Sequence, residues 1–135
     1  MGRPSGPKTR CGGRWTESRF NTFVRNILRS ASRKWAPIQD VKKKANVARG
    51  QYLCAGCKQV VPVTVKQGRK RVQNVFVDHI DPIVDPNVGF VSFDVFTDRL
   101  FCEEDNLQVL CGPCHDSKTA EETKVATLRR KNNDS

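Results

Sequence analysis

The sequence predicts a small α+β domain preceded by a basic helical region. Three observations predict this class. Apolar residues recur at helical spacing over residues 15–35, and short valine-rich runs follow between residues 52 and 80. A third is a pair of Cys-x-x-Cys motifs in the second part of the chain. A chain of 135 residues has room for one modest core, and a core of that size often needs a metal or disulfide link.

The charge of the chain is high and unevenly distributed. There are 24 Lys and Arg against 14 Asp and Glu, a formal net charge of +10. Residues 1–50 hold 13 basic and 2 acidic residues, whereas residues 78–109 hold 1 basic and 8 acidic residues. Such a basic front favours a polyanionic partner, most often nucleic acid. A basic surface that is simply solvated is the alternative.

The chain has no pattern that is typical of membrane or secreted proteins. No apolar run approaches the roughly 20 residues of a membrane span, so no membrane partner is expected. The basic N-terminus is not followed by the apolar segment of a secretory signal. We therefore expect a reducing, cytoplasmic compartment, where paired cysteines are more often metal ligands than disulfides.

The first 50 residues are predicted to form two basic helices. Residues 1–14 are rich in Gly, Pro and cations and are expected to be a disordered arm, with Cys11 a free thiol. A helix over residues 15–35 has Thr16 as its N-cap. A second helix over residues 37–49 has Pro37 in its first turn and ends at Gly50. Residues 15–50 thus form a basic helical extension, whose cations either lie along a phosphate backbone or are solvated.

Residues 51–130 are predicted to alternate short strands and helices. A β-rich run with an edge position at Pro62 leads to a basic hairpin tip at residues 67–71, and a strand returns over residues 72–80. Ser92 caps a helix over residues 93–101, whose aromatic residues are read as core rather than as base-stacking groups. A strand at residues 107–110 precedes a final helix over residues 113–130. Residues 131–135 are expected to be a frayed tail.

The two Cys-x-x-Cys motifs have the spacing of two halves of one zinc site. Zinc takes four tetrahedral ligands, and a gap of two residues lets one turn supply two thiolates. Four thiolates leave no open position, so this zinc would be structural. Unliganded thiols or a redox pair are the alternative. Cys102 has no such partner and is predicted to be a small buried group. The four predicted ligands are Cys54, Cys57, Cys111 and Cys114.

Both histidines of the chain lie in runs that resemble the HNH nuclease family, of the zinc-containing type often found in bacteriophages. The runs are Asp78-His79-Ile80-x-Pro82, Asn106-Leu107-Gln108-x-Leu110-Cys111-x-x-Cys114-His115, and Lys118-Thr119. The resemblance covers residues 52–122 and implies a ββα-metal (His-Me finger) core, stapled by the four-cysteine zinc, in a nuclease domain over residues 51–130. It also implies DNA as the substrate, in the cytoplasm of a bacterial host.

The resemblance implies a role for each residue of these runs. His79 would be the general base and Asn106 would brace the loop that orients it. Asp78 and His115 would hold one Mg²⁺ or Mn²⁺ ion. An imidazole suits proton removal from water near neutral pH, and a divalent ion offsets charge on a phosphate. The predicted DNA-contacting cations are Arg25, Arg29, Arg33, Lys42, Lys43, Lys44, Arg69, Lys70, Arg71 and Lys118, although Lys118 fits a solvated position equally well.

Several questions stay open from the sequence. The segment between His79 and Asn106 is long for this family and adds carboxylates at Asp81, Asp85 and Glu104, which are read as structural or solvated with one as a possible further ligand. A zinc-stapled nucleic-acid-binding module without catalysis also explains the charge and the cysteines. A zinc-ribbon adaptor between proteins leaves the basic front unexplained. The sequence does not determine the cleavage specificity, whether the substrate is DNA or RNA, or the oligomeric state.

Overall fold

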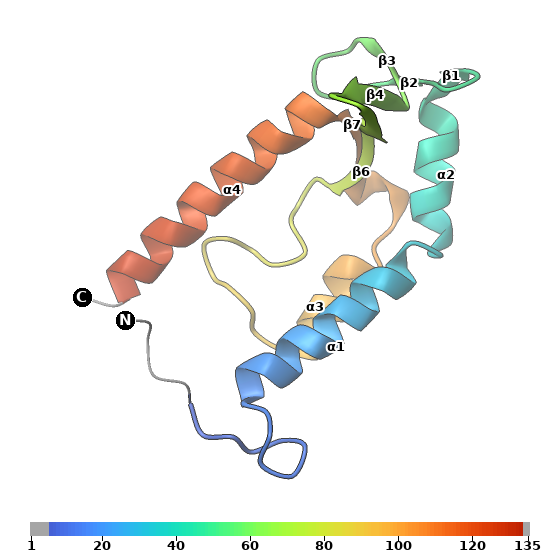
Figure 1. Cartoon of the computed structure of the whole chain (residues 1–135). Helices are drawn as coiled ribbons and strands as arrows, with labels where there is room; N and C mark the ends of the chain where they lie inside the picture. Colours follow the sequence, from blue (N-terminus) through green and yellow to red (C-terminus); the bar gives the residue numbers. More distant parts are fainter. Residues whose placement is uncertain (1–5, 134–135) are drawn as a thin grey trace. The chain divides into compact units, whose positions relative to one another are not determined.

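The structure is a computed structural model that describes residues 6–133 (Figure 1). The chain divides into two compact units, Met1–Arg33 and Lys34–Ser135. Helices and small antiparallel sheets are mixed along the chain, which confirms the α+β class. Among the described residues, no helix has both the length and the apolar character that crossing a membrane requires.

The first unit consists of a tight turn and the helix α1, Glu17–Ser32. Thr16 caps α1 as predicted, because its side-chain oxygen accepts a hydrogen bond from the backbone of Arg19 at 3.1 Å. Arg10 and Trp15 form two backbone hydrogen bonds of 3.0 Å around a turn with positive φ at Cys11. The described part of the expected disordered arm therefore includes an ordered turn, while residues 1–5 lie outside the description.

The helix α2, Ala36–Ala45, opens the second unit with a proline in its first turn. It ends earlier than predicted because residues 46–48 form a strand, and Gly50 (φ 69°) lies in the turn after that strand. Asn46 stabilises this turn by donating to the carbonyl of Ala48 at 3.0 Å. At the other end of α2, the indole of Trp35 donates to the carbonyl of Cys102 at 2.7 Å and packs edge-on against Phe101.

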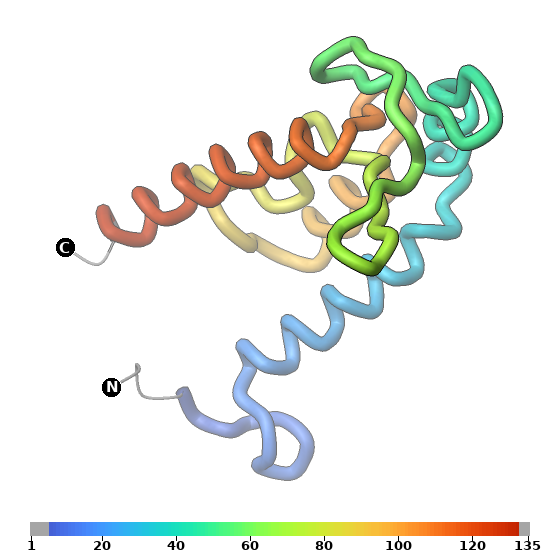
Figure 2. Tube along the Cα trace, turned by 45° about the horizontal axis from the view of Figure 1, so that its top comes forward, coloured from blue at the N-terminus to red at the C-terminus, as the bar shows by residue number. Residues whose placement is uncertain are grey.

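Seven short strands form three antiparallel sheets in the described part of the second unit. The predicted return strand over residues 72–80 is divided at Asn74 into two strands that belong to different sheets. Figure 2 traces the chain from the hairpin at residues 64–73 into the following strand. The sheets are β1 (Asn46–Ala48), β2 (Gln51–Leu53) and β3 (Val60–Pro62); β4 (Thr64–Gln67) and β5 (Lys70–Gln73); and β6 (Val75–His79) and β7 (Leu107–Cys111).

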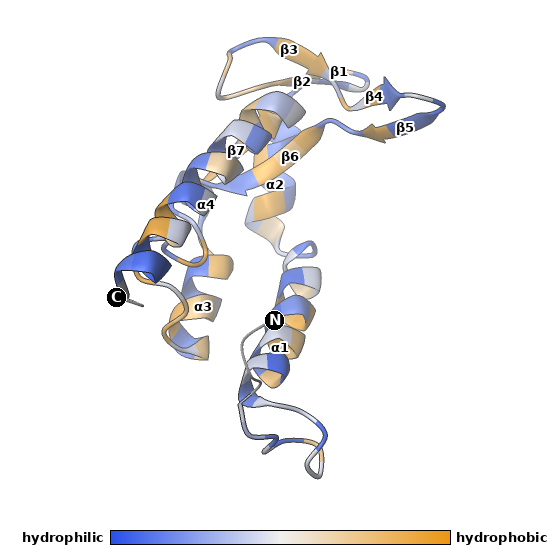
Figure 3. Cartoon of the chain, turned by 60° about the vertical axis from the view of Figure 1, so that its left-hand side comes forward, coloured by the Kyte–Doolittle hydropathy of each residue, from blue (hydrophilic) through white to orange (hydrophobic). Residues whose placement is uncertain are grey.

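Three further helical segments lie in the second unit as far as residue 133. Ser92 caps α3, Phe93–Leu100, through a 3.2 Å hydrogen bond from the backbone of Val95, and Phe96 and Leu100 are buried as predicted. A short 3₁₀ turn, Glu104–Asn106, leads into β7. The helix α4, Gly112–Asn133, continues through the start of the expected frayed tail, and residues 134–135 lie outside the description. Figure 3 shows hydrophobic β6 beside the start of α4.

Candidate functional site

Four cysteine sulfurs converge in the second unit. The turn after β2 supplies Cys54 and Cys57, the end of β7 supplies Cys111, and the first turn of α4 supplies Cys114. All four Sγ atoms lie within 4.8 Å of one another, and the Sγ atoms of Cys57 and Cys111 are 3.9 Å apart. Sulfurs bound to one zinc ion at about 2.3 Å lie about 3.8 Å apart. This cysteine cluster could therefore hold a metal ion such as zinc.

The turn that contains Cys54 and Cys57 lies close to Cys114 and to β7. A Cβ added at Gly56 would lie 3.0 Å from the Sγ of Cys114 and 3.1 Å from its Cβ, so a side chain there would push the two halves of the cluster apart. The backbone of Lys58, with φ 62°, closes the turn by donating to the carbonyl of Cys54 at 2.9 Å. Ala55 donates to the carbonyl of Val109 at 2.8 Å, which ties the turn to β7.

The thiols of the cysteine cluster differ in acidity. Burial raises the pKa of Cys54, but backbone N–H donors from Cys111, Cys57 and Gly56 outweigh it and lower the pKa to about 6. The neighbouring sulfurs of Cys111 and Cys54 raise the pKa of Cys114 to about 12. Four adjacent thiolates repel one another, so full ionisation of the cluster needs a bound cation.

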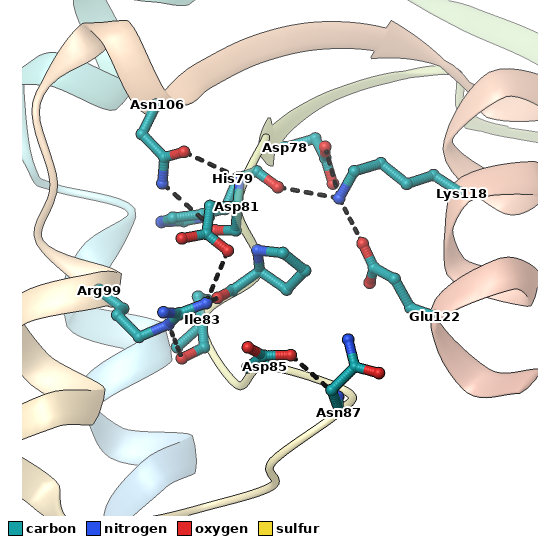
Figure 4. Close-up of polar contacts among 11 residues, drawn as sticks. Asp78, His79, Asp81, Ile83, Asp85, Asn87, Arg99, Asn106, Lys118 and Glu122 are labelled. Atoms are coloured by element: carbon teal, nitrogen blue, oxygen red, sulfur yellow. Dashed lines mark hydrogen bonds and ion pairs between the residues drawn. The ribbon is translucent and has the colours of Figure 1, made fainter. Parts of the chain in front are cut away.

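A second group of polar residues surrounds the end of β6 (Figure 4). Asp78 is nearly buried, with 13% of its side chain exposed. Its carboxylate accepts a 3.0 Å hydrogen bond from Gln108 on the paired strand and lies 3.2 Å from the ammonium of Lys118 on α4. Register pairing of Asp78 with Gln108 places both side chains on one face of the β6–β7 sheet.

His79 is oriented by the helix α3. Its Nε2 lies 2.9 Å from the carbonyl oxygen of Leu100, the last residue of α3. A carbonyl oxygen only accepts, so Nε2 carries the proton in this contact and Nδ1 is left with a free lone pair. The geometry therefore fixes a tautomer in which Nδ1 can take a proton.

Asn106 holds the chain that follows His79. Its side-chain oxygen accepts a 2.8 Å hydrogen bond from the backbone N–H of Asp81, and its side-chain nitrogen donates to the carbonyl of Asp81 at 3.2 Å. The carbonyl of Asn106 accepts from the N–H of Ile80 at 2.8 Å. One residue thus fixes the backbone immediately after β6.

His115 lies in the first turn of α4 and stacks on Phe76, with ring centroids 4.5 Å apart and an interplanar angle of 13°. Phe76 and Asp78 share one face of β6 because side chains alternate along a strand. His115 and Lys118 are three residues apart on one face of α4. Phe76 contacts His115 and Asp78 contacts Lys118, so Asp78 and His115 both lie where β6 meets α4.

Within residues 6–133, the cysteine cluster is the one group of three or more potential ligands that lie together. No further carboxylate, imidazole or thiolate there joins Asp78 and His115 in such a group.

Lys118 has a more central place than the sequence indicated. Its ammonium donates to the carbonyl of His79 at 2.9 Å and also pairs with the carboxylates of Asp78 and Glu122. Burial lowers the pKa of Lys118, but the hydrogen bonds that its ammonium donates to Glu122 and Asp78 outweigh this effect and raise the pKa above its usual value. The four-residue spacing of Lys118 and Glu122 on a predicted helix was the available signal for this contact.

Arg99 was missed by the sequence analysis. From α3 it donates to the carbonyls of Pro82 and Ile83 at 2.8 and 3.0 Å, and it forms a 2.8 Å ion pair with Asp81. With Asn106, it fixes the loop after His79. The signal that could have found it is the charge pattern, since Arg99 is the single cation among residues 78–109.

The other predicted DNA-contacting cations differ in their contacts. Lys44 forms a 2.6 Å ion pair with Glu104, and Arg71 donates to the backbone and hydroxyl of Thr64. Lys42 lies 5.7 Å from the centre of the Tyr52 ring. On α1, Arg25 donates to the carbonyl of Asn21 at 3.3 Å. The side chains of Arg29, Arg33, Lys43, Arg69 and Lys70 are exposed.

No protein-family model, curated protein or solved structure matches this chain.

Proposed function

We propose that this chain is a divalent-metal-dependent endonuclease of the HNH type that hydrolyses phosphodiester bonds of DNA. One observation carries the proposal. Asp78 and His79 end β6 next to α4, and Asn106 fixes the backbone beyond them through three hydrogen bonds. The β6–β7 pair followed directly by α4 supports a ββα-metal core.

In the proposed reaction, His79 is the general base. The Leu100 carbonyl holds its Nε2–H, so Nδ1 takes the proton from the attacking water. Asp78 and His115 would hold Mg²⁺ or Mn²⁺, which would neutralise charge on the phosphate and on the leaving oxygen. Asn106 and Arg99 act as positioning residues, because they hold the loop that follows His79.

Lys118 must leave Asp78 when a divalent ion binds there. Its ammonium now pairs with Asp78 and Glu122, so binding exchanges one cation for another. The released ammonium is then free to contact a phosphate oxygen, in keeping with the sequence-based prediction for Lys118.

We further propose that the cysteine cluster holds a structural Zn²⁺. The cluster joins the turn after β2 to the end of β7 and the start of α4. His115 directly follows Cys114, so the metal fixes the helix turn that presents this histidine. Such thiols persist in a reducing compartment, which is consistent with a cytoplasmic location.

The test is a plasmid-cleavage assay with added Mg²⁺ or Mn²⁺. The wild-type protein should nick or linearise supercoiled DNA. His79→Ala should reduce the rate by about 10²–10⁴-fold, the typical contribution of a general base. DNA affinity and zinc content of the variant should stay unchanged, which separates loss of chemistry from loss of fold.

A non-catalytic nucleic-acid-binding module is the second candidate. The observation that favours it is the Lys118 contact, which fills the coordinating side of Asp78 with an ammonium. Under this alternative, wild type and His79→Ala would show the same activity, or none with any of several divalent ions, while both bind DNA.

A further inference from the structure

The basic hairpin made of β4, β5 and their connecting turn, residues 64–73, forms a sheet of its own. We call it the ribbon. Gly68, with φ 64°, and Arg69 form a two-residue turn between the strands. A positive φ at the first turn residue gives the turn a twist that matches the twist of the two strands. Figure 3 shows the ribbon extending away from β6 and α2. All six residues from Lys66 to Arg71 are exposed, and four of them are cations.

The cations of the ribbon occupy both of its faces and its tip. Lys66 pairs with Arg71 across the strands, and Gln67 pairs with Lys70. Because paired residues share a face and successive pairs alternate, Lys66 and Lys70 point to opposite faces, with Arg69 at the turn. No carboxylate of residues 6–133 forms an ion pair with these three side chains. Cations on both faces match a nucleic-acid groove, which has phosphates along both walls. A single nucleic-acid strand would contact only one face of the ribbon.

The dimensions of the ribbon suit the major groove of duplex DNA. Four residues per strand give a reach of about 13 Å, and the strands lie about 4.8 Å apart. The major groove of B-form DNA is about 12 Å wide and about 8.5 Å deep and admits a two-stranded ribbon. The deep, narrow major groove of duplex RNA does not admit side chains in this way.

The ribbon is followed by Asn74, which connects it to the cysteine cluster and, through β6, to His79. Asn74, 7% exposed, donates from its side chain to the carbonyl of Pro62 at 3.0 Å. Its own carbonyl accepts from Gly112 at 3.0 Å, between two cysteines of the cluster. The next strand, β6, runs five residues to His79, a length of about 17 Å. The groove bound by the ribbon would therefore have a fixed offset from a phosphate at His79.

We propose that the ribbon inserts into the major groove of duplex DNA and places the duplex against the end of β6. This inference deepens the proposed function by naming duplex DNA as its substrate. It rests on the proposed function only for the cleavage step, because groove binding is measurable without cleavage.

The binding test uses the full chain without added Mg²⁺ or Mn²⁺, and compares duplex DNA, single-stranded DNA and duplex RNA of one sequence. The variant Arg69→Ala/Lys70→Ala removes two phosphate contacts, so the salt slope for duplex DNA should fall by about 2 and the affinity at 0.15 M salt by about 30-fold. Single-stranded DNA affinity should change less than about threefold.

A charge-matched control is Lys124→Ala/Arg130→Ala, at exposed positions of α4. It should change duplex affinity less than about threefold. An equal loss in the control, an equal loss on single-stranded DNA, or wild-type binding to duplex RNA as tight as to duplex DNA would overturn the inference.

Methylation protection of the wild-type complex gives a second measurement that needs no variant. Guanine N7 faces the major groove, so a short run of guanines should be protected there. Unprotected guanines throughout the bound site would also overturn the inference. If the protection and the affinity losses occur but no divalent ion supports cleavage, the ribbon inference stands and the proposed nuclease activity fails.

Discussion

The cysteine cluster and the polar group at the end of β6 are assembled by opposite means. In the cluster, four like side chains point at one another. Besides the backbone donors around Cys54, few contacts position their sulfurs. At β6, Asp78 and His79 each have a protein partner, Lys118 and the Leu100 carbonyl. Full ionisation of the first arrangement needs a bound cation, whereas in the second the ammonium of Lys118 already pairs with Asp78. Loss of a cysteine should therefore affect folding, and changes around β6 should affect activity first.

The largest effect is expected from Cys54→Ser or Cys111→Ser. Zinc binding to four thiolates contributes about 10–16 kcal/mol, which equals or exceeds the stability of a small domain. Each variant should lose zinc and the cooperative unfolding transition, measured by metal analysis and circular dichroism. Cys102→Ser, outside the cluster, should retain both. Full zinc retention in either cluster variant would contradict the assignment.

Arg99→Ala should destabilise the loop after His79. The change removes an ion pair with Asp81 and leaves the carbonyls of Pro82 and Ile83 without their donor, at a cost of about 1–3 kcal/mol. Arg99→Lys should recover only part of this, because lysine lacks the forked donor set. Thermal unfolding measures the effect.

Arg49→Ala, at an exposed position, is the matched control for Arg99 and should leave the unfolding temperature almost unchanged. If Arg99→Ala behaved like this control, Asn106 alone would hold the loop after His79 and Arg99 would have no part in positioning it.

Lys118→Met tests whether an ammonium occupies the place of the divalent ion. The variant leaves Asp78 and Glu122 without their shared cation, so the metal-free protein should lose about 1–2 kcal/mol. Mn²⁺ should then bind about tenfold more tightly, since it no longer displaces a contact worth about 1.4 kcal/mol. The unfolding temperature without metal reports the first quantity, and its increase on addition of Mn²⁺ reports the second.

The comparison for Lys118 is Lys124→Met, whose ion pair with Glu121 is exposed and 3.8 Å long. It should change neither the stability nor the response to Mn²⁺ measurably. An identical Mn²⁺ response in the two variants would show that Lys118 does not compete with a metal ion at Asp78.

The local parts of the fold were the most predictable from the sequence. Thr16 and Ser92 cap helices as expected, because an N-cap depends on one side chain and the next few backbone groups. Boundaries set by distant contacts were less predictable. The helix α2 stops at Ala45 because Asn46 and Gly50 support a strand turn, and the return strand breaks at Asn74 because that side chain bonds to Pro62 and Gly112.

The candidate site was predictable in its residue types and less so in its contacts. The paired spacing of the cysteines specifies two half-sites, and the structure brings all four together. The partners of Asp78 and His79 were not predictable. Lys118 and Leu100 lie 40 and 21 residues from them along the chain, and nothing in a local pattern specifies such contacts.

The sequence by itself determined the α+β class, the cysteine spacing and the separation of a basic front from an acidic segment. These properties depend on residue identity and short-range order. The tertiary structure decided which thiols meet, which tautomer of His79 is held, and that Arg99 and Lys118 belong to the same polar group. Those outcomes depend on strand register and helix packing, because only folding brings the end of β6 to α3 on one side and to α4 on the other.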